Sequence, residues 1–252
     1  MRRVATTLAV LAFQWIFLGA DTPRPAATVI ASARMGGLPL LTLWSWQRAE
    51  DLRDIDRKST AIAYLDQTVR VGSSVEAVPR TQAFAFPAGS TLVPVVRIEV
   101  QAGAELGSRA QEKVAEIIAQ SASRPGSAAL QIDFDATRSQ RDFYRGILLL
   151  VRHRIPQNMP LSMTALVSWC SYDDWIGGLP VDEAVPMFFR MGPDARRIGA
   201  AELRIVEPLC SGSVGVSTHE VWPEEMNGKR AYVFADHGWN EDFPLLADRR
   251  LP

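Results

Sequence analysis

Short apolar runs that alternate with amphipathic stretches constrain the fold of this chain more than any other feature. Several runs, such as LQIDF, ALVSW and AVPMFF, are too continuously apolar for a sheet with one face in water. Such runs are typical of parallel strands covered on both sides. Amphipathic helices are expected over residues 107–121 and 139–153, each lying between two runs. The order strand, helix, strand, helix, strand is typical of βαβ units.

The number of runs favours a barrel. The candidate strands are residues 40–46, 61–68, 92–100, 129–135, 161–169, 184–191, 213–218 and 230–235. Eight strands in about 230 residues fit the size of a (β/α)8 barrel. The segment after the second run alternates like a β-hairpin around Gly72, and the chain after the eighth run is short and interrupted by proline. We therefore predict an irregular α/β fold, a (β/α)8 TIM-like barrel with some helices short or missing. An open doubly wound sheet is the alternative.

Residues 1–20 have the composition of a signal peptide. Arg2 and Arg3 precede an apolar run over residues 4–18, which small residues follow. This run is shorter than the roughly 20 residues that a spanning helix needs, so we expect no stable membrane span after cleavage. An uncleaved N-terminal anchor is the alternative. We predict that residues 21–252 form a single TIM-like barrel domain and that the protein is periplasmic or secreted.

The expected state of the two cysteines depends on the compartment. Outside the cytoplasm Cys170 and Cys210 can form one disulfide, whereas in a reducing compartment they would be unpaired buried thiols. The export signal favours the disulfide. Two cysteines without a matching histidine pair do not make a zinc site. His219 and His237 are too few to argue for a metal, so the sequence predicts neither a metal nor another cofactor.

The charge balance excludes some classes of partner. The chain has 27 Lys and Arg against 28 Asp and Glu, and no basic run. We therefore expect no nucleic-acid partner. The glycines near residue 212 lack the Lys of a phosphate-binding P-loop, and no G-x-S-x-G nucleophile motif occurs.

Polar and aromatic side chains gather where the predicted strands end. In (β/α)8 barrels the catalytic and binding residues lie at the C-terminal ends of the strands. Here these ends carry Trp44, Trp46, Arg97, Glu99, Asp133, Asp135, Trp169, Arg190, Glu220 and Asp236. Loops are rich in polar residues in any protein, so each candidate needs a chemical reason of its own.

Asp133 and Asp135 are the central candidates. Two residues apart on a strand, their side chains would leave the same face and point to the barrel interior and its mouth. Two close carboxylates repel each other, which raises the pKa of one and suits general acid or base catalysis. The structural alternative is that Asp133 pairs with a buried arginine, Arg97 or Arg190, while Asp135 caps the next helix.

The tryptophans at the strand ends suggest the class of ligand. Trp44, Trp46 and Trp169 would offer flat apolar faces at the barrel mouth, on which the C–H groups of a sugar ring can pack. Packing in the core or at the rim is the alternative for each of them.

Several segments resemble domain of unknown function 3142, a bacterial family. They are LTLWSWQRAEDLRDID, TAIAYL, VPVVRIEV, ALQIDFDATRSQRDFYRGIL, LSMTALVSWC, GLPVDEAVPMFFRMGPD, CSGSVGVSTHE and AYVFADHGW. The resemblance implies an exported protein with a TIM-like barrel and brings no established activity.

More loosely, LQIDFDA resembles the chitinase-type glycoside hydrolases, whose motif is D-x-x-D-x-D-x-E. That resemblance implies that Asp133 and Asp135 match the middle pair, while Leu130 replaces the first Asp and Thr137 the acidic Glu. The catalytic acid of that family is therefore missing from its expected place.

We predict an exported barrel that binds a carbohydrate, and a glycoside hydrolase is the enzyme class that it would fit. Its catalytic candidates are Asp133, Asp135, Glu99 and Glu220, and its substrate-binding candidates are Trp44, Trp46, Arg97, Trp169, Arg190 and Asp236. The alternative is a non-catalytic envelope protein that binds a glycan or a protein partner through the same mouth. The sequence leaves both open.

Overall fold

The computed structural model describes residues 33–191, 204–223, 228–249 and 251. The predicted signal peptide, residues 1–20, lies outside the described residues.

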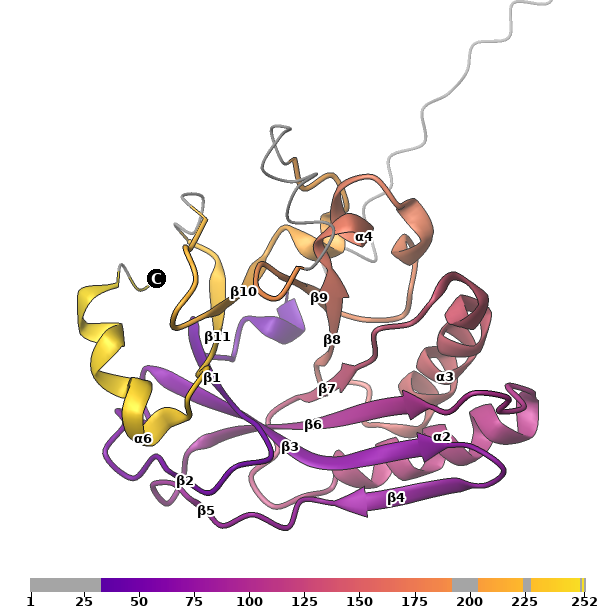
Figure 1. The fold of residues 1–252 in the computed structure, drawn as a ribbon, viewed down its shortest axis with the longest axis horizontal. Coiled ribbons are helices and arrows are strands. Elements are labelled where there is room, and N and C mark those ends of the chain that lie inside the picture. Colours follow the sequence, from indigo (N-terminus) through magenta and orange to yellow (C-terminus); the bar gives the residue numbers. More distant parts are fainter. Residues whose placement is uncertain (1–32, 192–203, 224–227, 250, 252) are drawn as a thin grey trace, which may run out of the picture.

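Eight parallel strands close into a ring. They are β1 (Leu41–Ser45), β3 (Thr60–Val71), β6 (Thr91–Val100), β7 (Leu130–Asp133), β8 (Leu161–Leu166), β9 (Glu183–Met187), β10 (Ser213–Ser217) and β11 (Arg230–Phe234). Each strand pairs with the next in this order, and β1 pairs with both β3 and β11, which closes the barrel (Figure 1). The predicted irregular TIM-like barrel is confirmed, and the alternative of an open sheet is wrong.

Two long helices cover one side of the barrel. α2 (Ser108–Ser121) connects β6 to β7, and α3 (Arg141–Arg154) connects β7 to β8. They lie side by side against these strands in Figure 1. Their apolar faces, which carry Val114 and Ile118 on α2 and Ile147 on α3, are fully buried. The amphipathic patterns in the sequence therefore predicted both helices correctly.

The remaining named helices are short. η1 (Arg138–Gln140) leads into α3, α4 (Val167–Ser171) and η2 (Asp174–Ile176) follow β8, η3 (Pro208–Cys210) precedes β10, and α6 (Trp239–Asp242) and η4 (Phe243–Asp248) follow β11. No helix in the described ranges is long and apolar enough to cross a membrane.

A hairpin extends the barrel wall where the sequence predicted one. β4 (Val75–Pro79) pairs antiparallel with the end of β3, and the turn lies at residues 72–74. A separate two-stranded parallel sheet joins β2 (Glu50–Asp51) to β5 (Phe84–Ala85).

The fifth predicted strand is shorter than expected. β8 ends at Leu166, and the residues that follow form the helix α4, so Trp169 lies on a helix rather than on a strand. A short apolar run fits a buried helix as well as a buried strand, because periodicity does not separate them over so few residues. The fourth strand ends early too, at Asp133, which leaves Asp135 in the loop after it.

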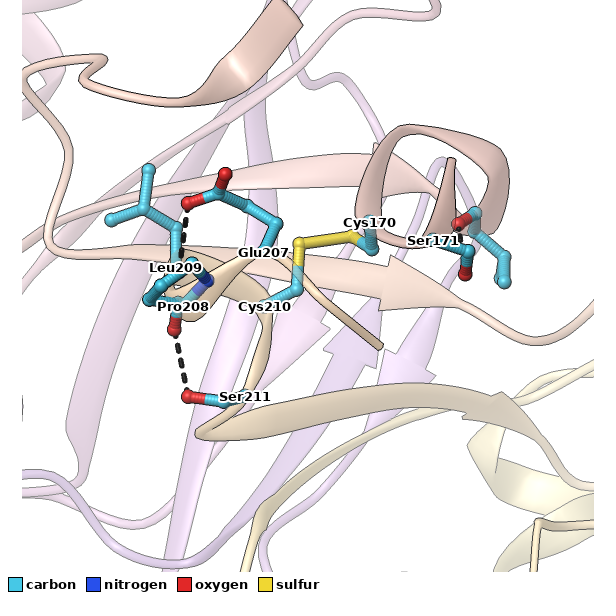
Figure 2. The surroundings of a disulfide bond; sticks show 8 residues. Cys170, Ser171, Glu207, Pro208, Leu209, Cys210 and Ser211 are labelled. Atoms are coloured by element: carbon cyan, nitrogen blue, oxygen red, sulfur yellow. Dashed lines mark hydrogen bonds between the residues drawn. A yellow bond between two sulfur atoms is a disulfide. The ribbon is translucent and has the colours of Figure 1, made fainter. Parts of the chain in front are cut away.

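A disulfide joins α4 to η3. Cys170 and Cys210 are bonded, with their α-carbons 5.8 Å apart (Figure 2), which confirms the predicted pairing. The backbone oxygen of Cys170 also accepts hydrogen bonds from the N–H groups of Val206 and Glu207. The segment before β10 is thus held covalently and by hydrogen bonds against the segment after β8.

The barrel interior contains a buried polar network. Its members are Trp44, Gln131, Ser162, Glu183, Arg230 and Tyr232. At the N-terminal ends of the strands, the Glu183 carboxylate accepts hydrogen bonds from the Arg230 guanidinium at 2.8 Å and from the Tyr232 hydroxyl at 2.7 Å. The side chains of this ion pair are only 8% and 4% exposed. Strong mutual pairing is what permits charges to be buried at this depth.

Candidate functional site

A cavity of about 270 Å³ opens at the C-terminal ends of the strands. It is lined by Trp44, Trp46, Arg97, Asp133, Asp135, Thr164, Leu166, Val167, Met187, Phe189, Arg190, Met191 and Phe234. Six of the predicted site residues are therefore brought together, and these are Trp44, Trp46, Arg97, Asp133, Asp135 and Arg190. Glu99, Trp169, Glu220 and Asp236 do not line the cavity.

Asp133 is the buried acid of this cavity. One carboxylate oxygen accepts a hydrogen bond from the Arg97 guanidinium at 2.9 Å, and the other accepts one from the Thr164 hydroxyl at 2.8 Å. Burial raises the pKa of Asp133 above its ordinary value of 3.8, nearby Asp135 adds to the rise, and Arg97 opposes it. The ion pair between Asp133 and Arg97, which the sequence offered as the structural alternative, is therefore present, and both residues line the cavity.

The raised pKa of Asp133 predicts how stability changes with pH. A carboxyl whose pKa is higher in the folded state than in the unfolded state stabilises the fold below the unfolded pKa, here near 3.8. That contribution is lost as the pH rises through the folded pKa. We therefore expect the free energy of unfolding of the wild type to fall relative to that of Asp133→Asn as the pH rises from acid to neutral.

Urea unfolding of both proteins over a series of pH values measures this difference. The carboxyls that the two proteins share titrate in both, so their effects largely cancel. A difference that stays constant, or that shifts in favour of the wild type with rising pH, would contradict the raised pKa.

Asp135 lies just past the end of β7 and is exposed at the cavity. It does not cap the next helix, because Thr137 is the N-cap residue of η1. The Thr137 backbone N–H donates to the Gln140 side chain at 2.9 Å, which forms a reciprocal capping box. The capping alternative for Asp135 is therefore wrong. Thr137, at the position where chitinase-type enzymes have their acid, has a structural role instead.

Aromatic rings form much of the cavity wall. Trp44 is buried there, with its indole N–H donating to Gln131 at 2.7 Å, and the Arg97 guanidinium lies over the half-buried ring of Trp46. Phe189 and Phe234 stack nearly parallel, with their centroids 5.5 Å apart. The sequence pointed only to tryptophans as the aromatic wall and not to this pair, although each phenylalanine lies within a predicted strand, residues 184–191 and 230–235.

Trp169 and Glu99 lie outside the cavity. Trp169 is buried in the outer core and packs edge-on against Trp175, with centroids 4.9 Å apart. This position disagrees with its predicted use as a sugar platform and follows from its place on α4. The Glu99 carboxylate is half-exposed and lies within 3.5 Å of the guanidinium groups of Arg97 and Arg70.

Glu220 and Asp236 surround Arg190 at the rim. Glu220 accepts a hydrogen bond from the Arg190 backbone N–H at 3.0 Å, and an Asp236 oxygen lies 3.5 Å from its guanidinium. The guanidinium also lies over the Phe234 ring. Arg190 has a φ of 51°, the only positive φ at a described residue other than glycine. Such strain persists where surrounding contacts fix the backbone, and it often occurs at binding sites.

The closed ring of eight parallel strands, with a lined cavity at their C-terminal ends, defines a TIM-like barrel. Residues 88–185 match the family Domain of unknown function (DUF3142), which confirms the resemblance drawn from the sequence. The matched segment contains six lining residues, namely Arg97, Asp133, Asp135, Thr164, Leu166 and Val167.

The comparison with solved structures finds the chitinase domain of the spore coat protein CotE from Clostridium difficile. It is 13% identical, with a TM-score of 0.41, and the likeness covers 62% of this chain and 52% of that one. The chain thus spans about half the length of that solved chain, and a likeness of this extent carries no conclusion about activity. No curated protein sequence matches the chain.

Proposed function

We propose that the cavity at the barrel mouth binds a carbohydrate. The observation that carries the proposal is the combination of aromatic side chains with charged groups in one cavity, namely Trp46 and Phe189 beside Asp135 and Arg190. A sugar ring presents C–H groups that pack on aromatic faces and hydroxyls that hydrogen-bond to carboxylates and guanidinium groups.

The size of the cavity fits a small ligand. Its volume of about 270 Å³ lies near the lower end of small-molecule sites, which are roughly 300–1,000 Å³. This supports the terminal unit of a glycan as the bound group.

Hydrolysis of a glycosidic bond is the second candidate function. It is favoured by the juxtaposition of a buried carboxyl of raised pKa, Asp133, with the exposed carboxyl of Asp135 in the same cavity. Two carboxyls in different environments are the usual basis of acid and base roles. Both oxygens of Asp133 already accept hydrogen bonds from Arg97 and Thr164, which supports binding more than proton transfer.

We also propose that the protein works outside the cytoplasm, in the periplasm or as a secreted protein. The Cys170–Cys210 disulfide supports this location, because such bonds persist in oxidising compartments. The basic and apolar composition of residues 1–20 supports it as well.

A glycan panel screened by thermal shift tests the proposal, since a ligand that binds only the folded state raises the melting temperature. For a glycan that binds, we expect Trp46→Ala and Asp135→Asn each to weaken the affinity about 10- to 100-fold, because each removes one of the two kinds of contact. Calorimetric titration measures the change. The matched control is Trp222→Ala, which removes a half-buried tryptophan that does not line the cavity.

The outcomes separate the candidate functions. Binding that survives both cavity variants, or no melting shift across the panel, would overturn the carbohydrate proposal and favour a protein partner at this mouth. Release of reducing ends from the bound glycan, abolished in Asp135→Asn, would add hydrolysis to binding. Binding without release would leave the barrel a glycan-binding protein.

A further inference from the structure

Three side chains outside the cavity converge on one point at the same end of the barrel. His219 follows β10, His237 follows β11, and Asp242 ends α6. His219 Nε2 lies 3.0 Å from His237 Nδ1 and 3.1 Å from Asp242 Oδ1. His237 Nδ1 lies 3.5 Å from Asp242 Oδ1, so the three atoms form a triangle. The two imidazole rings meet edge to face, with centroids 4.4 Å apart.

These contacts are difficult to satisfy with protons alone. The Nε2 atom of His219 holds either one hydrogen or one lone pair, and it faces both the carboxylate oxygen of Asp242 and the Nδ1 atom of His237. With a hydrogen it must share that hydrogen between the two, and with a lone pair it repels the carboxylate. A cation among the three atoms would use both imidazole lone pairs and the carboxylate at once.

The triangle has the dimensions of a metal site. A tetrahedral ion with bonds of about 2.0–2.1 Å holds its ligand atoms about 3.3 Å apart, close to the three distances here. Two imidazole nitrogens and one carboxylate oxygen are ligands that zinc and its neighbours among the transition metals accept. We propose that His219, His237 and Asp242 bind one divalent transition-metal ion, for which Zn²⁺ fits best.

The surroundings of Asp242 orient it for this role. Its side chain is 2% exposed, and its Oδ2 atom accepts hydrogen bonds from the Thr218 hydroxyl and the His237 backbone N–H. The Oδ1 atom is thereby turned toward the two imidazoles. Hydrogen bonds of this kind to the outer atoms of a ligand are typical of metal sites.

The opposite side of the triangle is accessible. The side chains of His219 and His237 are 43% and 60% exposed, so an ion can reach them from solvent. Three protein ligands and one position open to solvent are the arrangement of zinc sites that bind water or a further ligand. None of the three residues lines the cavity. Asp236 connects them to it, because its carboxylate accepts a hydrogen bond from the His219 backbone N–H and lies beside the guanidinium of Arg190, a cavity-lining residue.

Titration of the tag-free protein tests the proposal, after chelator treatment and dialysis and without any glycan. We expect ZnCl2 to bind with a stoichiometry of one by calorimetry, and Co²⁺ to give the intense visible absorption of a tetrahedral site. His219→Ala and His237→Ala should each weaken Zn²⁺ binding at least about 100-fold, because loss of a direct ligand exceeds the 10- to 100-fold cost of losing an outer partner.

His153→Ala is the matched control, because it removes the third histidine of the chain, an exposed residue on α3, and should leave binding unchanged. Circular dichroism establishes that each variant is folded. Wild-type protein that is folded and binds no Zn²⁺, or a folded His219→Ala/His237→Ala double variant that binds as tightly as the wild type, would overturn the proposal. Neither result bears on carbohydrate binding in the cavity.

Discussion

Replacing Arg230 by methionine should destabilise the barrel by about 3–5 kcal/mol, because it leaves a buried carboxylate without its partner. Arg230 and Glu183 form the ion pair inside the barrel, and Arg230 also donates to the backbone oxygen of Met35. The Tyr232 hydroxyl alone cannot replace the lost charge. The effect is therefore much larger than the cost of the removed contacts.

Urea unfolding at neutral pH measures this effect. A double variant, Arg230→Met with Glu183→Gln, removes the charge as well as its partner and should recover part of the loss. Arg70→Met is the matched control, because it breaks a half-exposed pair with Glu99, which should contribute at most about 1 kcal/mol. Equal losses in Arg70→Met and Arg230→Met would show that burial of the pair does not matter.

Removing the disulfide should cost about 4 kcal/mol, the value that the chain-entropy relation gives for a loop of this length. Cys170 and Cys210 are 40 residues apart, so the bond closes a long loop in the unfolded chain. We expect Cys170→Ala/Cys210→Ala to fold, since the backbone contacts of residue 170 remain, but to unfold at a clearly lower denaturant concentration.

Reductant provides the internal control for this variant. Dithiothreitol should lower the stability of the wild type to near that of the double variant and leave the variant itself unchanged. Wild-type stability that is the same with and without reductant would contradict the prediction.

The order of strands and helices could be predicted from the sequence, because the signals are local and repeated, whereas the number of runs only favoured a closed barrel over an open sheet. Short apolar or β-branched runs marked every strand of the ring, and the amphipathic periods marked α2 and α3. The end of β8 could not be placed, because the run that continues into α4 is apolar in either conformation. The predicted strand therefore included Trp169, which lies on α4.

The site could be predicted only in part, because its geometry depends on contacts between distant segments. The spacing of Asp133 and Asp135 identified the acidic side of the cavity, since both come from one strand and its loop. The stacked pair of Phe189 and Phe234 joins the ends of two separate strands. Asp242 could not be predicted, because no sequence motif connects it to His219, 23 residues earlier.

The hydrogen bond between Trp44 and Gln131 affects how the cavity can discriminate among ligands. The Gln131 amide donates a hydrogen bond to the Ser162 hydroxyl and accepts one from the Trp44 indole. The position of the indole is therefore fixed in the absence of a ligand. A wall that is already ordered loses little side-chain freedom on association. Selectivity in such a preorganised site resides mainly in the dissociation rate. Ligands that fit poorly dissociate faster, whereas their association rates differ little.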